Sequence, residues 1–274
     1  MMFPIGVVTR NRVECLDATL RSLSATALPD DVVTTVVHDG AGDDPRMHRY
    51  LTTDEPIPRV EDWIEFPGEL GLDVLDDSPM TGIVGRVELI QLDERRGVAN
   101  ASNAALVHML DAYPDAERIA LLQDDVVLNV DWLGRVLRGF DERLASDKEP
   151  GLVSGLRIND IDKSPIAEVT SEWFSSAQVL VFSRRCLKSL DKELRQEYGF
   201  KNGWDTWTCY RVRDRGFTVH LVHPSVGQHI GVKSIVRPNV RWEHKDPRGR
   251  ISYEARPPYA MATTVRNMSL RAGG

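Results

Sequence analysis

The octapeptide Leu121-Leu122-Gln123-Asp124-Asp125-Val126-Val127-Leu128 places two adjacent carboxylates in an apolar run that begins at Ile119. Ionised aspartate is seldom buried unless it is paired or binds a metal, so the pair requires a positive partner. A buried strand that ends in Asp124 and Asp125 fits open α/β sheets, where ligands bind beyond the carboxyl ends of the strands. Carboxylate oxygens suit Mg²⁺ or Mn²⁺, which often complete their coordination with substrate phosphates. A turn opened by the two aspartates is the simpler alternative.

Strand and helix patterns alternate along the chain before this stretch. Residues 5–8 and 32–37 have the apolar, β-rich composition of buried strands, and residues 13–23 between them carry apolar side chains at helical spacing. Two strands joined through a helix form a parallel βαβ unit. A third strand, a helix and a fourth strand follow at residues 87–92, 98–110 and 119–122. The sequence therefore predicts an α/β fold with a Rossmann-like, mostly parallel sheet flanked by helices.

Composition limits the class of protein. The 274 residues carry a net charge of −7, and 42% of them are hydrophobic, which suffices for a large core. No apolar run reaches the ~18 residues of a membrane span and no signal-peptide pattern is present, so we expect a cytoplasmic protein without a membrane span. Cys15, Cys186 and Cys209 form no C-x-x-C pair, which argues against disulfides and a zinc site.

The charge is unevenly distributed. Residues 233–274 hold nine Lys/Arg against three Asp/Glu, so the rest of the chain is strongly acidic. An acidic domain is a poor nucleic-acid binder as a whole, and an anionic partner would have to meet the basic tail or a local patch. A solvated tail explains the same charges.

Four segments with polar or glycine-rich composition follow the predicted strands in a fixed order. They are Thr9-Arg10-Asn11-Arg12, His38-Asp39-Gly40-Ala41-Gly42-Asp43, Arg95-Arg96-Gly97-Val98-Ala99-Asn100-Ala101-Ser102-Asn103-Ala104-Ala105-Leu106 and Gln123-Asp124-Asp125. In this order they resemble the GT-A glycosyltransferases, in particular the inverting nucleotide-sugar transferases with a D-x-D-type metal motif. The last segment is similar to the Glu-Asp-Asp variant of N-acetylglucosaminyltransferases, with Gln123 in place of Glu.

The second half of the chain extends the resemblance to about residue 235. Gly203-Trp204-Asp205 resembles the acidic motif on the acceptor side of that family. Residues 224–231, Pro-Ser-Val-Gly-Gln-His-Ile-Gly, resemble a segment of branching N-acetylglucosaminyltransferases. The resemblance implies a GT-A type fold with an acceptor-side subdomain. It divides the chain into a nucleotide-sugar-binding half (1–128), an acceptor-binding and catalytic half of the same domain (129–236) and a basic tail (237–274). Separately, residues 44–82 are rich in proline, glycine and carboxylates without a long clean period, which indicates an irregular insertion.

The resemblance also implies a donor site for a UDP-sugar with bound Mn²⁺ or Mg²⁺. A divalent ion that clamps both phosphates neutralises the charge of the leaving nucleotide. Asp125 and His229 are the expected metal ligands, and Asp124 is expected to reach the ribose or a metal-bound water. Asp39 occupies the family position that accepts the imide N–H of uracil, although turn formation explains this residue almost as well.

Further donor contacts are expected from three other segments. Thr9, Arg10 and Arg12 would meet the base, ribose or phosphate beyond the first strand. Arg96 and Asn100 lie in the segment that passes beside the nucleotide in the family, and Lys233 would hold the diphosphate after closure of its loop. Each of these residues could instead be a solvated loop residue.

Asp205 is the candidate catalytic base. Inverting transfer to a hydroxyl group needs one carboxylate that takes the proton of the acceptor. Asp205 lies between Trp204 and Trp207, whose indoles can stack on sugar faces. An Asp that caps a helix starting at Thr206 is the structural alternative.

The sequence therefore predicts a metal-dependent hexosyl- or N-acetylhexosaminyltransferase, with its acceptor hydroxyl on a glycan, a protein or a modified nucleobase. A sugar-1-phosphate nucleotidyltransferase would share the Rossmann-like half, but its first loop should be rich in glycine, and residues 9–12 contain none. A non-catalytic nucleotide-sugar-binding protein would keep the carboxylate pair without needing a base at Asp205.

Overall fold

Three neighbouring strands, β1 (Phe3–Thr9), β2 (Val32–His38) and β4 (Arg118–Gln123), form a parallel core in one half of the sheet. Every residue of β1 and β2 is buried, as are the four inner residues of β4. All three strands are parallel. Parallel strands are covered by helices on both faces, which explains why these segments are apolar throughout instead of alternating.

The computed structural model describes residues 2–26, 28–29, 31–40, 47, 86–141, 147–156, 164–169, 177–199 and 203–229. The predictions for the basic tail and Lys233 lie outside these residues, as does the predicted insertion except for the buried Met47.

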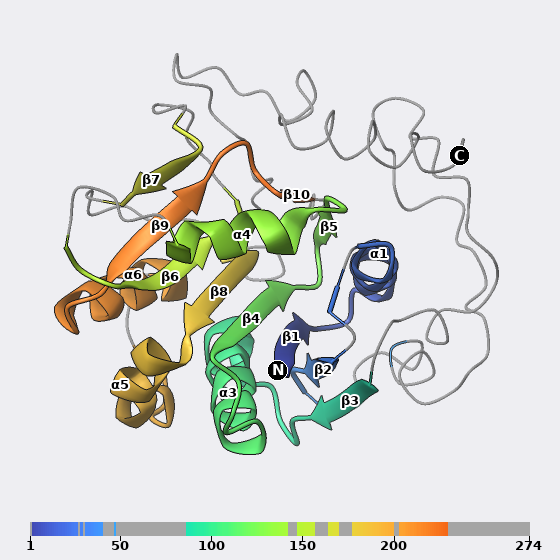
Figure 1. The fold of residues 1–274 in the computed structure, drawn as a ribbon. Helices are drawn as coiled ribbons and strands as arrows, with labels where there is room; N and C mark the ends of the chain where they lie inside the picture. Colours follow the sequence, from blue (N-terminus) through green and yellow to red (C-terminus); the bar gives the residue numbers. More distant parts are fainter. Residues whose placement is uncertain are drawn as a thin grey trace, which may run out of the picture.

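The full sheet has eight strands in the order β3-β2-β1-β4-β8-β6-β9-β7 (Figure 1). The strands not yet introduced are β3 (Arg86–Gln91), β6 (Pro150–Ser154), β7 (Ile166–Glu168), β8 (Val179–Ser183) and β9 (Thr218–Val222). β8 runs antiparallel to β4 and β6, and β7 runs antiparallel to β9, while the other neighbouring pairs are parallel. The predicted α/β fold with a mostly parallel sheet is confirmed, and the second half of the chain extends the same sheet.

Helices cover both faces of this sheet. α3 (Gly97–Ala112), α5 (Arg184–Leu194) and α6 (Trp204–Asp214) contribute to one hydrophobic cluster, and α1 (Val13–Ser24) and α4 (Trp132–Asp141) contribute to the other. In Figure 1 the two groups lie on opposite sides of the strands. None of the helices in the described ranges is long and apolar enough to cross a membrane.

A short two-stranded sheet lies beyond the end of β4. β5 (Val126–Leu128) pairs antiparallel with β10 (Gly227–His229), and Val126 lies opposite His229. A Cβ atom at Gly227 would lie 2.9 Å from Cγ2 of Val126 and 3.0 Å from the carbonyl oxygen of Val127. Glycine therefore allows β10 to approach β5 closely, which brings His229 next to the carboxylate pair.

Candidate active site

The strand register aligns three site residues at one edge of the sheet. Thr9 pairs with His38, and the amide of Asp39 donates to the carbonyl of Thr9 at 3.0 Å. On the other side of β1, the amide of Asp124 donates to the carbonyl of Val8 at 3.1 Å. Thr9, Asp39 and Asp124 therefore leave three adjacent parallel strands at the same level, at the carboxyl edge where α/β proteins bind ligands.

The turn after β1 directs its polar groups toward Asp124. Oδ2 of Asp124 accepts a hydrogen bond from the Thr9 hydroxyl at 2.7 Å and from the backbone N–H of Arg10 at 3.3 Å. Asn11 has φ 47°, a left-handed conformation that asparagine tolerates better than most residues. This turn lets the chain begin α1 with the side chain of Arg12 facing the carboxylates.

Arg12 joins both carboxylates through one guanidinium group. Its Nη1 lies 2.6 Å from Oδ2 of Asp125, its Nε lies 3.3 Å from Oδ2 of Asp124, and its Nη2 pairs with Oδ1 of Asp124. Asp124 is fully buried and Asp125 is 4% exposed. The positive partner that the buried pair requires is thus supplied by the chain itself, across more than a hundred residues of sequence.

His229 approaches Asp125 from β10. Its Nε2 lies 3.0 Å from Oδ2 of Asp125, while Oδ1 of Asp125 is buried and has no hydrogen-bond partner among the described residues. An unsatisfied buried carboxylate oxygen beside an imidazole is a donor set that suits Mn²⁺ or Mg²⁺. The described ranges contain no group of three or more His, Cys, Asp or Glu side chains that could hold a metal ion. Among the described residues, Asp125 and His229 could therefore hold such an ion as a pair, and phosphate and water could take further positions.

The two aspartates differ in their pKa. Burial raises the pKa of Asp124 to about 6, with the charge of Arg12 opposing this rise and that of Asp125 adding to it. Burial also raises the pKa of Asp125, but the charges of His229 and Arg12 outweigh it and hold that pKa below its usual range. The charges of both aspartates raise the pKa of Arg12, against the effect of its own burial. Asp125 is therefore the more firmly ionised of the two carboxylates.

Asp39 lies at the end of the neighbouring strand and is also buried. Its Oδ1 accepts a hydrogen bond from the backbone N–H of Arg96 at 2.7 Å, and its Oδ2 lies 3.9 Å from Nη1 of Arg10. The backbone of Arg96 therefore lies at the site. Its side chain is 49% exposed and lies 3.9 Å from Glu94.

Two asparagines of α3 connect this edge to the acceptor half. Asn100 donates to the carbonyl of Arg96 at 3.0 Å and accepts from the backbone N–H of Tyr198 at 2.7 Å. Asn103 accepts from the indole N–H of Trp204 at 2.8 Å. Asn100 thus has a positioning contact in this structure, and Asn103 is a residue that the sequence analysis missed. Only its place one turn after Asn100, on the same face of a helix, could have indicated it.

Asp205 is in the first turn of α6, immediately after the Trp204 that binds Asn103. Its Oδ1 accepts from the backbone N–H of Thr206 at 2.8 Å, and its position suits the positive end of the helix dipole. Burial of Tyr198 raises the pKa of its hydroxyl, and the charge of Asp205 raises that pKa further. The helix starts at Trp204 and not at Thr206, so Asp205 is inside the helix and does not cap it. A catalytic role for Asp205 remains a prediction.

A small cavity lies beside this part of α6. It has a volume of about 80 Å³, and Tyr198 and Trp207, which meet edge to face at 5.5 Å, both line it. Asn103 also lines it, and Nδ2 of this residue is buried without a hydrogen-bond partner among the described residues. Aromatic faces next to polar groups are typical of sugar contacts.

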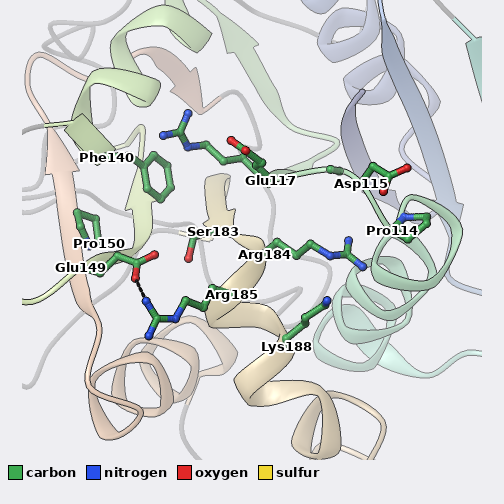
Figure 2. A pocket seen from close by; sticks show the side chains of 12 residues that line it. Pro114, Asp115, Glu117, Phe140, Glu149, Pro150, Ser183, Arg184, Arg185 and Lys188 are labelled. Carbon is green, nitrogen blue, oxygen red and sulfur yellow. Dashed lines mark hydrogen bonds and ion pairs between the residues drawn. The ribbon is translucent and has the colours of Figure 1, made fainter. Parts of the chain in front are cut away.

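A larger hollow lies elsewhere in the described part of the chain. It has a volume of about 600 Å³ and is lined by residues at the start of β4, the start of β6 and the start of α5, as Figure 2 shows. Two of its arginines are engaged: Arg185 pairs with Glu149 at 2.6 Å, and Arg184 donates to the carbonyls of Leu110 and Tyr113. This hollow is at the amino edge of the parallel strands, opposite the carboxylate pair.

The structure thus gathers most of the predicted donor-site residues at one edge. Direct contacts join Thr9, Arg10, Arg12, Asp39, Asp124, Asp125 and His229. Arg96 joins them through its backbone, and Asn100 joins them through Arg96.

No protein-family model matches the chain, and no curated protein matches it. Solved structures do resemble it. The mannosyltransferase PcManGT from Pyrobaculum calidifontis, in complex with GDP-Man and Mn²⁺, has a TM-score of 0.53 and 19% identity, covering 82% of this chain and 55% of that chain. Residues 1–349 of S. aureus TarS, in complex with UDP-GlcNAc, have a TM-score of 0.52 and 14% identity, covering 83% of this chain and 57% of that one.

A structure of S. aureus TarS has a TM-score of 0.54 and 14% identity, covering 83% of this chain and 36% of that chain. The chain therefore spans less than two thirds of the length of each of these structures. At such identities the likeness concerns the fold, which is the GT-A type: a mixed, mostly parallel sheet flanked by helices.

Proposed function

We propose that this protein is a metal-dependent, inverting glycosyltransferase that moves a sugar from a UDP-sugar to an acceptor hydroxyl. The observation that carries the proposal is the buried pair Asp124 and Asp125 at the carboxyl edge of the sheet, next to His229 and Asp39. The fold adds support, because structures that share it were solved with GDP-Man and Mn²⁺ or with UDP-GlcNAc. A cytoplasmic location, expected from composition, is part of the same proposal.

Asp39 would recognise the base. One of its oxygens already accepts the N–H of Arg96, while Oδ2 lies 3.9 Å from Nη1 of Arg10 and would accept from a ligand. The imide of uracil offers one N–H, whereas guanine offers a ring N–H and an amino group together and would use both oxygens of a carboxylate. The contact with Arg96 therefore favours a uridine nucleotide. The Thr9–Arg10 turn beside Asp39 would complete the base and ribose contacts.

Asp125 and His229 would hold the divalent ion, which when bound supplies positive charge to the two phosphates of the leaving nucleotide. The chain contributes the geometry: Gly227 lets β10 approach β5, and the pairing of Val126 with His229 fixes the imidazole beside the carboxylate. Lys233, outside the described residues, remains a predicted phosphate contact.

Asp205 would act as the base that takes the proton of the acceptor hydroxyl. Asn100 and Asn103 of α3 hold the segments on either side of it, through the backbone of Tyr198 and the indole of Trp204. The cavity beside Trp207 would bind part of the acceptor. These contacts fix α6 relative to the donor edge, and such a link is what positions a base against a donor sugar.

The rival functions make different demands on these residues. A sugar-1-phosphate nucleotidyltransferase should bind nucleoside triphosphates through a glycine-rich loop, and Thr9-Arg10-Asn11-Arg12 has no glycine. A non-catalytic binding protein would bind the donor without breaking its glycosidic bond.

A nucleotide-sugar panel tests the proposal. Thermal shift and slow donor hydrolysis should be measured for UDP-, GDP- and ADP-sugars and for nucleoside triphosphates, each with and without Mn²⁺. The proposal expects stabilisation and hydrolysis with a UDP-sugar that depend on Mn²⁺. Stabilisation by triphosphates alone, or Mn²⁺-dependent binding without turnover in the presence of any acceptor, would favour one of the two rivals.

A further inference from the structure

The guanidinium of Arg12 lies where an ion shared by the two carboxylates would be expected. It contacts both oxygens of Asp124 and one oxygen of Asp125, and all its hydrogen bonds described above go to these two residues. Of the four carboxylate oxygens, only Oδ1 of Asp125 is left without a partner in the part of the chain that the structure describes. One cation of the chain thus contacts three of the four carboxylate oxygens before any ligand arrives.

We propose that Arg12 is an internal counter-cation that holds Asp125 in the nucleotide-free protein, so that the metal ion and the nucleoside diphosphate bind cooperatively. The inference rests on the proposed function and deepens it, because it concerns the loading of the same site. Arg12 is a positioning residue here, since it acts through Asp124 and Asp125.

Electrostatics explains why the metal ion alone would bind weakly. A divalent ion at the free Oδ1 of Asp125 would come within a few ångströms of the guanidinium, which bonds Oδ2 of the same carboxylate at 2.6 Å. Like charges repel strongly at such distances in a buried site, where solvent screening is weak. The ion would also have to share a carboxylate whose Oδ2 already bonds Arg12 and lies 3.0 Å from Nε2 of His229.

A diphosphate removes this obstacle. It brings negative charge for the metal ion and offers the guanidinium a new bidentate acceptor, which is the geometry that arginine favours. The side chain of Arg12 is 23% exposed, so it has room to turn toward the opening of the site. Its departure would release Asp125 to the metal ion and Asp124 to the ribose. Because coupling between two ligands is reciprocal, Mn²⁺ should strengthen diphosphate binding by the same factor.

Direct metal binding tests the role of Arg12 without reference to turnover. The amount of free Mn²⁺ can be followed by electron paramagnetic resonance, with and without saturating UDP, in the wild type, Arg12→Gln and Arg12→Lys. Arg21→Gln is the matched control, because Arg21 is on the same helix but pairs with Asp17 at 2.8 Å in a partly exposed position. It removes the same formal charge without touching the carboxylate pair.

The expected results follow from charge. UDP should strengthen Mn²⁺ binding to the wild type by about tenfold or more, within the usual range of coupling between sites. Arg12→Gln should bind Mn²⁺ alone about tenfold more tightly than the wild type and should show less dependence on UDP. Arg12→Lys and Arg21→Gln should resemble the wild type. Without metal, Arg12→Gln leaves two buried carboxylates uncompensated, so its melting temperature should fall and Mn²⁺ alone should restore it.

Several outcomes overturn the inference. Unchanged or weaker Mn²⁺ binding in Arg12→Gln would do so, as would an equal gain in Arg21→Gln or in Arg12→Lys. Failure of Arg12→Gln to fold in the presence of Mn²⁺ would also count against it, because the metal ion should replace the missing charge. If the wild type binds no Mn²⁺ even with UDP, the metal dependence in the proposed function is itself wrong. If Mn²⁺ and UDP bind tightly and the Arg12 variants bind them as the wild type does, only the role of Arg12 is overturned.

Discussion

The two edges of the sheet hold charged residues in opposite ways. At the carboxyl edge Asp39, Asp124 and Asp125 are all at most 4% exposed, and one oxygen of Asp125 has no partner within the described ranges. At the amino edge the larger hollow is lined by Arg185 and Glu149, which pair with each other while remaining 78% and 44% exposed (Figure 2). The buried carboxylates of the carboxyl edge destabilise the fold unless a ligand compensates their charge. The exposed ion pair of the amino edge costs little free energy and needs no ligand.

The difference shows that volume alone is a poor guide to a site. The amino-edge hollow has a volume of about 600 Å³, but Arg185 pairs there with Glu149, and Arg184 donates to the carbonyls of Leu110 and Tyr113. The carboxyl edge concentrates buried charge with unequal pKa values, which is the pattern expected of functional sites. Substitutions at the two edges should therefore have very different effects on ligand binding.

The largest effect is expected at Asp125. Asp125→Asn keeps the size of the side chain but removes the charge that the divalent ion needs, so Mn²⁺-dependent stabilisation by UDP should disappear. Thermal shift with Mn²⁺, UDP and both together measures this. Glu149→Gln removes one carboxylate charge at the amino edge in the same way, and it should retain the full shift. A wild-type shift in Asp125→Asn would remove this residue as a metal ligand.

Asp205 should affect turnover without affecting donor binding. Asp205→Asn removes a proton acceptor but keeps a group that can accept from the N–H of Thr206. The rate of transfer should fall by about 10²–10⁴, as for the loss of a general base. The rate of transfer is measured in single-turnover experiments with a working acceptor, and the affinity for UDP is measured separately. The two measurements distinguish a loss of turnover from a loss of donor binding. Equal losses in both would mean that Asp205 supports the helix and not the chemistry.

The close approach of β10 gives a third, smaller effect. A methyl group at Gly227 would press on Val126 and the Val127 carbonyl at 2.9 and 3.0 Å, so Gly227→Ala should destabilise the fold by about 1–3 kcal/mol. It should also weaken Mn²⁺ binding, because it displaces His229 from Asp125. Gly134→Ala is the control: it lies in α4 with nothing within 4 Å of its Cβ position, and it should stabilise the helix by about 0.5–1 kcal/mol. Urea denaturation measures both, and equal stability of the two variants would refute the close contact.

The sequence was a good guide to the central strands and to their carboxyl ends. Buried parallel strands are continuous apolar runs, so β1, β2 and β4 were visible, and polar residues directly after them marked the edge where the site forms. The grouping of Asp39 with Asp124 follows from that rule once the strands are adjacent. Asp124 was predicted for this reason and from the resemblance to a family, whereas Asp39 was predicted from the resemblance.

Contacts that depend on the exact register and approach of distant segments could not be predicted. Arg12 was expected to meet the nucleotide, but in the structure its guanidinium pairs with carboxylates more than a hundred residues away. The helix α5 was missed although Cys186, Leu187, Leu190 and Leu194 recur at helical spacing and are buried. Its strongly charged remaining positions obscured that pattern. The spacing of apolar residues within a helix also gives no information on which faces of α3 and α6 will meet. Asn103 was missed for this reason.

The smallest effect is expected from Arg185 at the amino edge. Its guanidinium pairs with Glu149 at 2.6 Å and lies 5.9 Å from the ring of Phe217, but the side chain is 78% exposed. Exposed ion pairs contribute about 0–1 kcal/mol, because solvent screens the charges and both side chains lose rotational freedom. Arg185→Gln should therefore lower the free energy of unfolding by less than about 1 kcal/mol and leave Mn²⁺ and UDP binding unchanged. Urea denaturation and a UDP titration check the two expectations separately. A loss of UDP affinity in this variant would mean that the two edges are coupled, and the contrast between a binding edge and a structural edge would then be wrong.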